Sequence, residues 1–449
     1  MNSAKEKPAS TESVNKELIL KVVLPFGFLL AGWSTLWAVY NNFVPVFLQA
    51  GNPVFDKGGA AVTYGFGLSA FAAGLLMSID NLLNLISGPF VGRWSDKTGK
   101  RLPFIRWSVP LAILCFLALP FVVKLIPSES NGNLSQLLVP FSMMCVLVLV
   151  IVVGSVFSGV PAYALRYQLI PSKIRSQATG YIELIGAFGS VLAYALSGVL
   201  YQINAVLPFI VFGGLFMLAI FYFLAVVKEP THWTPAAETS VEGRSLKDVL
   251  DVFQDFSPKQ KMNVLLVMLI GFLFNFGIGP IATYGSSYVV NVLELSEGMA
   301  ASMGAIFFIG YLLGTVPMGY LPKWITRRGA LMLGAGIAAV SALVIILAPN
   351  FTLLQIMVGI MGFGFAAPQV ILYPVLSDIV PNEKSFGAMI GLLIFSLALA
   401  TTISVPFWGK MIDIFRNYEL VWVAVVLAAA LAIVTSFFLS MGEAKEEQS

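Results

Sequence analysis

The chain has 449 residues, 58% of them hydrophobic and 11% charged, with a formal net charge of +3 and a mean hydropathy of +0.87. A soluble domain of this composition would expose too much apolar surface, so the composition predicts an all-α polytopic protein in a lipid bilayer. Cys115 and Cys145 fall inside apolar runs, which predicts packing residues and no disulfide or metal site. His232, the one histidine, lies in a polar segment and argues against a His-based catalytic centre.

Twelve apolar runs are long enough to cross about 30 Å of hydrocarbon. They predict membrane helices over 18–48, 64–92, 103–125, 138–165, 176–201, 207–227, 262–290, 299–321, 329–347, 351–379, 385–411 and 418–440. The polar segments divide the chain into a tail (1–17), a six-helix bundle (18–227), a linker (228–261), a second six-helix bundle (262–440) and a second tail (441–449).

The distribution of basic residues predicts the orientation of these spans. With a cytoplasmic N-terminus, 22 of the 26 Lys and Arg residues fall in cytoplasmic segments. We therefore predict a multi-pass protein of the cell membrane whose two termini and linker are cytoplasmic.

A weak internal repeat relates the two bundles at an offset of 210 residues. The matching positions are Tyr163, Pro171 and Ala178 in the first copy and Tyr373, Pro381 and Ala388 in the second. Both copies stand where the fourth span of a bundle ends and the fifth begins. This placement predicts two pseudo-symmetric six-helix bundles related by an axis along the membrane normal, as in one large class of secondary transporters.

Asp80 lies near the middle of the second span, in FGLSAFAAGLLMSIDNLLNLISGPFVG. A carboxylate at membrane depth costs about 3 kcal/mol or more and commonly marks an ion or substrate pathway. No Lys or Arg occupies the central part of another span, so we expect Asp80 to be protonated, to bind a cation or to face water. Asn84 shares its helix face and Asn81 lies alongside. For all three, the alternative role is interhelical hydrogen bonding without transport chemistry.

A basic loop follows the second span as Gly92-Arg-Trp-Ser-Asp96-Lys-Thr-Gly99-Lys100-Arg101, here called the gating loop. Gly92 permits close helix approach, and Gly99 predicts a tight turn at positive φ. Asp96 and the bases, Lys100 and Arg101 among them, can form an ionic latch to neighbouring helix ends that rearranges as the bundles move. The alternative is a loop that is basic only because it is cytoplasmic.

The gating loop resembles the helix 2–3 signature of the major facilitator superfamily, and a second copy without the acid runs from Gly319 to Gly329. The segments IDNLLNLISGPFVGRWSDKTGKRLPFI, YALRYQLIPSKIRSQATG and GWSTLWAVYNNFVPVFLQ resemble the glycoside–pentoside–hexuronide:cation symporters and the related sucrose-type symporters. This resemblance implies a twelve-helix fold that moves a sugar together with a proton or a sodium ion.

The chain departs from the pattern of those symporters in two places. Where the melibiose-type members have two acids near the proline of helix 2, this chain has Gly88 and Asn84, and Asp80 lies one turn further out. Where an acid is expected in the helix 4–5 segment, the chain has Gln168, although the repeat partner Asp378 is acidic. These departures argue against an intact sodium site and favour proton coupling through Asp80, with Asn84 as a neighbouring group.

Polar and aromatic side chains within the spans are the candidates for solute binding. Trp33, Trp37 and Asn41 recur every four residues along the first span, with Tyr40 and Asn42 beside them. Aromatic rings suit the C–H faces of a sugar and amides suit its hydroxyls, whereas core packing is the alternative role. Further candidates, on the second span and on the opposite wall of a central cavity, are Asn81, Asn275, Tyr284, Gln369 and Tyr373.

Glu183, near the start of the fifth span, is a further candidate for cation coupling. The alternative is an ion pair with Arg175, Arg166 or Arg106 at the cytoplasmic edge.

The seventh span contains a predicted break. Gly277, Gly279 and Pro280 interrupt it in FNFGIGPIATYG. Backbone groups freed by a break are tolerated only beside protein or water, so this position is predicted to be a bend in a gate.

These features predict a monomeric secondary active transporter that moves a sugar or glycoside by alternating access, coupled to protons in preference to sodium. Beyond the coupling ion we expect no cofactor, no metal and no nucleic-acid partner. The alternative is export or exchange of an amphiphilic drug or lysolipid, although the fifth span lacks the glycine–proline signature common in antiporters of the superfamily. No enzyme is predicted, because the sequence offers no cluster of acids, metal ligands or nucleophile and base, and no GxxxxGK[ST] loop.

Overall fold

The computed structural model describes residues 16–52, 65–126, 134–170, 175–229, 256–380 and 383–440. The greater part of the predicted tails and linker (1–15, 230–255 and 441–449) lies outside the described residues. Within the described ranges, the secondary structure is helical and contains no strand.

The N-terminal half contains the first six membrane crossings. Its helices are α1 (Lys16–Leu18), η1 (Ile19–Val23), α2 (Leu24–Gln49), α3 (Ala70–Met77), α4 (Ile79–Thr98), α5 (Leu102–Val123), α6 (Leu134–Leu169), α7 (Arg175–Ile203) and α8 (Leu207–Val226). The first three form one continuous crossing. The second crossing consists of α3 and α4, which are separated at Ser78.

The C-terminal half contains the other six crossings. Its helices are α10 (Pro258–Asn291), α11 (Glu297–Tyr320), η4 (Leu321–Lys323), α12 (Arg327–Leu347), α13 (Phe351–Ile379), α14 (Glu383–Phe415) and α15 (Leu420–Phe438). Among the described helices, eleven are long and apolar enough to cross a membrane, and the divided second crossing completes twelve. The predicted twelve-helix architecture is therefore confirmed.

Each half repeats the same pattern of packed helices. In the N-terminal half, α2 packs against α7 and α8, while α6 packs against α4 and α5. In the C-terminal half, α10 packs against α14 and α15, while α13 packs against α11 and α12. The fourth helix ends at Leu169 in one half and at Ile379 in the other, again 210 residues apart. The predicted pseudo-symmetry of the two bundles is confirmed.

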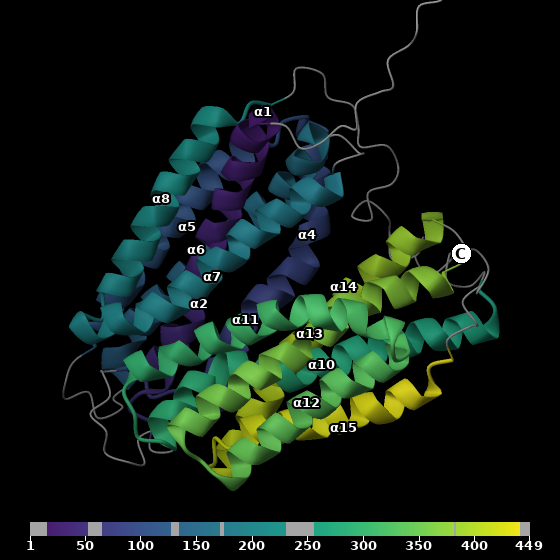
Figure 1. Ribbon diagram of the computed structural model, residues 1–449. Helices are drawn as coiled ribbons and strands as arrows, with labels where there is room; N and C mark the ends of the chain where they lie inside the picture. Colours follow the sequence, from purple (N-terminus) through teal and green to yellow (C-terminus); the bar gives the residue numbers. More distant parts are fainter. Residues whose placement is uncertain are drawn as a thin grey trace, which may run out of the picture.

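The two halves meet at one end and diverge toward the other (Figure 1). Two helix pairs join the halves: α7 packs against α11, and α3 packs against α14. These are the fifth with the eighth crossing and the second with the eleventh, so the pseudo-symmetry relates one pair to the other. We call this end the closed end, defined by Gln49, Ala70, Ser287 and Asp413. The opposite end, which carries the gating loop, is called the loop end.

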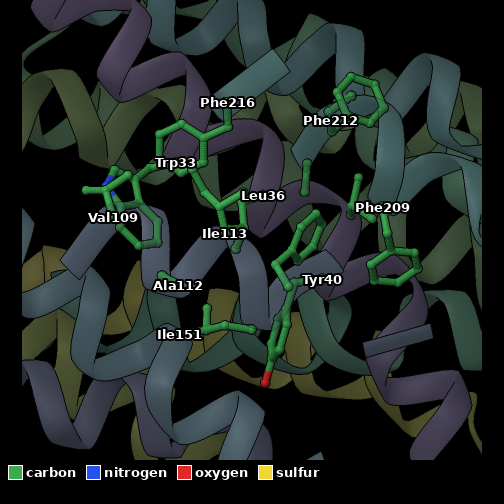
Figure 2. Close-up of a cluster of buried hydrophobic side chains, with 14 of the residues drawn as sticks. Trp33, Leu36, Tyr40, Val109, Ala112, Ile113, Ile151, Phe209, Phe212 and Phe216 are labelled. Atoms are coloured by element: carbon green, nitrogen blue, oxygen red, sulfur yellow. The ribbon is translucent and has the colours of Figure 1, made fainter. Parts of the chain in front are cut away.

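The core of the N-terminal half fixes the position of α2. Figure 2 shows Trp33, Leu36 and Tyr40 of α2 packed among side chains of α5, α6 and α8. The ring of Phe216 lies 5.2 Å from that of Trp33 and fills the space above Gly32, where a Cβ would come within 1.9 Å of it. A larger residue at Gly32 would therefore push α8 away from α2.

The predicted break in the seventh span is wrong. The helix α10 runs without interruption through Gly277, Gly279 and Pro280. Pro280 has no N–H to donate to the carbonyl of Phe276, but the hydroxyl of Ser404 on α14 donates to that carbonyl instead. The neighbouring helix thus satisfies the group that proline leaves without a partner, and the helix continues.

Removing this substitute donor should destabilise the protein. Ser404→Ala leaves the Phe276 carbonyl buried without its donor and is expected to cost about 1 kcal/mol, measured as a lower thermal unfolding midpoint in detergent. The matched control is Ser396→Ala, because Ser396 on the same helix also donates to an α10 carbonyl, that of Met268, at 3.0 Å. The N–H of Phe272 can still serve that carbonyl, so the control should cost less. Equal losses in both variants would contradict this account.

Candidate functional site

A cavity of about 400 Å³ lies between the two halves. Its lining residues come from α2 and α7 of the N-terminal half and from α10, α11 and α13 of the C-terminal half, with five aromatic rings and four amides among them: Tyr194, Phe307, Phe308, Tyr311, Phe365, Asn41, Asn42, Asn275 and Gln369. Of the lining residues that the structure describes, none carries a formal charge. The cavity therefore offers a mainly apolar surface with a few hydrogen-bonding groups, which is typical of small-molecule sites.

Two contacts connect the halves beside this cavity: one joins two aromatic rings, and the other joins a side-chain amide to a backbone carbonyl. The ring of Tyr194 on α7 stacks on that of Phe308 on α11, with 5.4 Å between centroids. The Asn42 amide of α2 lies 3.3 Å from the Ser197 hydroxyl and donates weakly to the Ala301 carbonyl at 3.5 Å. The ring contact and the Asn42–Ala301 hydrogen bond join the two halves, whereas the Asn42–Ser197 contact lies within the N-terminal half. A solute in the cavity would therefore touch residues that hold the two halves together.

Four of the predicted binding residues lie in the cavity, namely Asn41, Asn42, Asn275 and Gln369. The Asn41 amide hydrogen-bonds with the Tyr194 hydroxyl, and the Asn275 amide donates to the Gly271 carbonyl of its own helix at 3.1 Å. These amides can exchange such partners for those of a solute, because each keeps further donor and acceptor capacity.

Trp33, Trp37 and Tyr40 lie in the core of the N-terminal half and not among the cavity residues. Their rings contact one another, with Trp33 stacked on Trp37 at 6.4 Å and Trp37 edge-on to Tyr40 at 5.3 Å. Core packing accounts for these positions, and solute contact by the three residues stays a prediction.

Tyr284 and Tyr373 also lie away from the cavity lining. Tyr284 is fully buried at the closed end, where its hydroxyl is 2.7 Å from the Ala70 carbonyl and 3.0 Å from the Val405 carbonyl. Tyr373 packs against the core of the C-terminal half and is an electrostatic neighbour of the cavity residue Tyr311.

Asp80 stands directly after the division of the second crossing. Its carboxylate accepts the backbone N–H of Asn81 at 2.7 Å and the side-chain amide of Asn81 at 3.1 Å. The first N–H groups of a helix have no partner inside the helix, so this carboxylate supports the first turn of α4. Its electrostatic neighbour on α2 is Tyr40, which directly precedes the cavity residue Asn41. The side chain of Asn84 is outside the described residues.

The division itself lies at Ser78, which has no glycine or proline beside it. The Ser78 hydroxyl donates to the Gly74 carbonyl at 2.8 Å, and its backbone takes φ −88° and ψ −7°. A serine hydroxyl that bonds to the preceding turn competes with the helix ladder and favours a bend at that place.

The gating loop forms the turn that its glycine predicts. Gly99 has φ +64°, as expected. Gly92 is buried, and a Cβ at this position would lie 3.4 Å from the side chain of Val160 on α6. Lys100 is exposed, whereas Arg101 is buried and its backbone N–H donates to the Glu229 carboxylate. The side chain of Asp96 is outside the described residues.

Ionic contacts at the loop end join helices of the same half. Arg166 of α6 lies 3.2 Å from Glu183 of α7, so the ion pair proposed as the alternative role of Glu183 is present. Glu183 is also an electrostatic neighbour of Tyr311 in the other half and is about half exposed, which places it near the cavity. In the C-terminal half, Arg327 of the second loop copy pairs with Asp378.

Sequence reasoning missed the aromatic residues of the cavity and two acids. Tyr194, Phe307 and Phe308 had no distinguishing signal, because the chain has 35 Phe and 14 Tyr residues. The missed acids are Glu229, which holds the start of α5, and Asp413, which accepts two backbone N–H groups of α3. An acid at the end of an apolar run signals a helix cap, but its partner helix cannot be read from the sequence.

Two pseudo-symmetric bundles around a central cavity define the chain as a membrane transporter of small molecules. The chain matches the family model of the Major Facilitator Superfamily over residues 26–385 and again over 266–449. It belongs to this superfamily.

Similar proteins of known sequence include two resistance proteins. The chain is 22% identical over 377 residues to multidrug resistance protein 1 of Bacillus subtilis (strain 168), covering 82% of this chain and 87% of that protein. It is 24% identical over 283 residues to quinolone resistance protein NorA of Staphylococcus aureus (strain Mu50 / ATCC 700699), covering 61% of this chain and 63% of that protein.

Similar solved structures share the fold at low identity. One is a peptide transporter POT, with a TM-score of 0.67 and 13% identity over 93% of each chain. Another is a D-xylose–proton symporter, with a TM-score of 0.62 and 17% identity over 91% of this chain and 95% of that one. A bacterial homologue of the human lysosomal transporter Spinster, in an inward-facing and occupied conformation, gives a TM-score of 0.63 at 16% identity over 92% of this chain and 93% of that one.

Proposed function

We propose that the protein exports a neutral amphiphilic compound by alternating access, in exchange for protons. The observation that carries this proposal is the cavity between the halves, in which aromatic rings surround four amides and no described lining residue is charged. Aromatic rings bind extended apolar surface, and a few amides fix its orientation. The similarity to two proteins named for drug resistance supports the same class of solute.

Orientation is part of the proposal. The excess of Lys and Arg at the loop end, in the tails and in the linker supports a cytoplasmic loop end. The closed end then faces outward, and the conformation described is accessible from the cytoplasm, as in the inward-facing Spinster homologue.

Proton coupling is proposed to act through Asp80. The carboxylate supports the first turn of α4, and protonation would weaken its hydrogen bonds to the Asn81 N–H. A change at this turn alters the angle between α3 and α4, and α3 forms part of the closed end. Asp80 on α4 is an electrostatic neighbour of Tyr40 on α2, and the next residue of α2, Asn41, lines the cavity. This sequence of neighbours provides the physical connection between Asp80 and the solute.

Symport of a sugar or glycoside is the second candidate, favoured by the four amides that line the cavity. A sugar presents hydroxyls at many positions, so it would depend on Asn41, Asn42, Asn275 and Gln369 together. Against it, Trp33 and Trp37, the aromatic platforms expected for a sugar ring, lie in the core.

A pair of variants tests which class of solute is carried. In everted vesicles with an imposed pH gradient, the wild type should accumulate the neutral amphiphile N-phenyl-1-naphthylamine and release protons from the lumen, while methyl-β-galactoside should neither accumulate nor compete. Phe308→Ala should raise the half-saturation concentration about tenfold, because a ring contact is lost, and Gln369→Ala should raise it less. Sugar symport predicts the reverse order of the two variants and proton-driven uptake in right-side-out vesicles.

A further inference from the structure

The closed end contains a carboxylate that holds a helix of the opposite half. Asp413, near the end of α14, places Oδ1 2.9 Å from the Ala70 nitrogen and Oδ2 2.9 Å from the Phe71 nitrogen. Both donors belong to the first turn of α3, whose third N–H, that of Ala72, is accepted by the Ser69 hydroxyl at 3.2 Å. Hydrogen bonds from backbone N–H to a carboxylate are charge-assisted, and the helix dipole of α3 strengthens them.

The surrounding packing keeps α3 close to α14. A Cβ at Gly74 of α3 would lie 2.1 Å from the Tyr284 hydroxyl, and one at Gly409 of α14 would lie 2.4 Å from the same atom. The Tyr284 hydroxyl itself contacts carbonyls on α3 and α14. Because α3 and α14 are packed this closely, the two carboxyl oxygens of Asp413 are held in a fixed position relative to the backbone of α3.

A second polar contact joins the halves at the same end. The Gln49 amide of α2 donates to the Ser287 hydroxyl of α10 at 2.9 Å, and the Tyr418 hydroxyl donates to the Gln49 amide oxygen at 2.6 Å. All three side chains are buried, and all are neutral. The contact made by Asp413 differs because its acceptor is a carboxyl group that bonds two main-chain groups at once.

We infer that Asp413 is a positioning residue of the transport cycle, which holds the closed end shut by binding the first turn of α3. Asp413 is not among the cavity-lining residues, so it acts through α3 and not on the solute. Alternating access requires the halves to separate at this end, and both hydrogen bonds must then break. The free energy of these bonds sets how often the closed end opens, because a contact present in one state alone shifts the equilibrium toward that state.

The test measures access to the cavity from each side of the membrane. Ala282→Cys places a reporter in the cavity wall of a chain whose native Cys115 and Cys145 are replaced by Ala. The rate of its reaction with a membrane-impermeant maleimide is measured in right-side-out and in inside-out vesicles. Asp413→Asn keeps the shape of the side chain but loses the charge and one acceptor, and Asp413→Ser keeps one acceptor in a smaller side chain. Glu294→Gln, which neutralises an acid on the α10–α11 connection, is the matched control.

The inference predicts opposite changes on the two sides. Asp413→Asn should raise the labelling rate from the closed-end side about fivefold or more and lower it from the loop-end side, as expected for a coupling of 1–3 kcal/mol. Asp413→Ser should act in the same direction, and Glu294→Gln should change neither rate. Unchanged rates in both Asp413 variants would overturn the inference. A rise on both sides would also overturn it, because that result indicates a loosened fold. The inference rests on the alternating access of the proposed function, but the test involves no solute, so its outcome does not depend on which solute is carried or on proton coupling.

Discussion

Asp80→Asn is expected to abolish accumulation of solute against its gradient while solute counterflow persists. An asparagine keeps an acceptor for the Asn81 N–H, which lies 2.7 Å from the carboxylate, so the first turn of α4 should survive. It cannot gain or lose a proton, so the imposed pH gradient can no longer drive transport. The solute concentration inside should therefore rise only to the concentration outside, however steep the imposed pH gradient is.

The measurement compares pH-driven uptake with counterflow in proteoliposomes that contain equal amounts of protein. Counterflow by the wild type should vary with pH, and counterflow by Asp80→Asn should be pH-independent in the range where Asp80 titrates. Asn81→Ala is the control, because it removes the neighbouring amide but leaves the backbone N–H and the acid. Full pH-driven accumulation by Asp80→Asn would refute proton coupling at this residue.

Gly198→Ala should stop transport by preventing the closed end from closing. Gly198 of α7 faces Gly298 of α11 where the halves cross, and a Cβ at Gly198 would lie 2.1 Å from the Gly298 carbonyl oxygen. That oxygen is backbone and cannot rotate away, so the two helices must separate. We expect a loss of initial transport rate of about tenfold or more, since closely packed helices do not tolerate such an insertion without displacement.

The control for this variant lies on the same helix. A Cβ at Gly180 meets no atom of the described structure within 4 Å, so Gly180→Ala should leave transport unchanged and stabilise the helix slightly. Both variants should be compared at equal abundance in the membrane. Normal transport by Gly198→Ala would show that the contact between Gly198 and Gly298 is not needed in the cycle.

The helices and their arrangement could be predicted because each crossing is a local apolar run. The end of the fourth helix in each half lies where the 210-residue repeat places it. Asn41, Asn42, Asn275 and Gln369 could be predicted for the cavity because a polar side chain in an apolar span stands out from its neighbours.

The rest depended on contacts between distant parts of the chain. The break predicted at Pro280 does not occur, because Ser404, far along the sequence, supplies the missing donor. Trp33 has the same local sequence whether it faces a sugar or Phe216, and only the packing of α8 decides between them. The division at Ser78 has no glycine or proline to mark it, and the partner of Asp413 is 343 residues away.

The division of the second crossing at Ser78 has a consequence for the number of states in the cycle. If the second crossing were one rigid helix, its two ends would have to move in opposite directions at the same time. Here the eight-residue α3 is a separate helix from α4. Both α3 and α4 contact α14, and we expect α3, which Asp413 holds, to stay in place while α4, which carries the gating loop, tilts inward. Such a motion would give an intermediate that is closed on both faces of the membrane and encloses its solute.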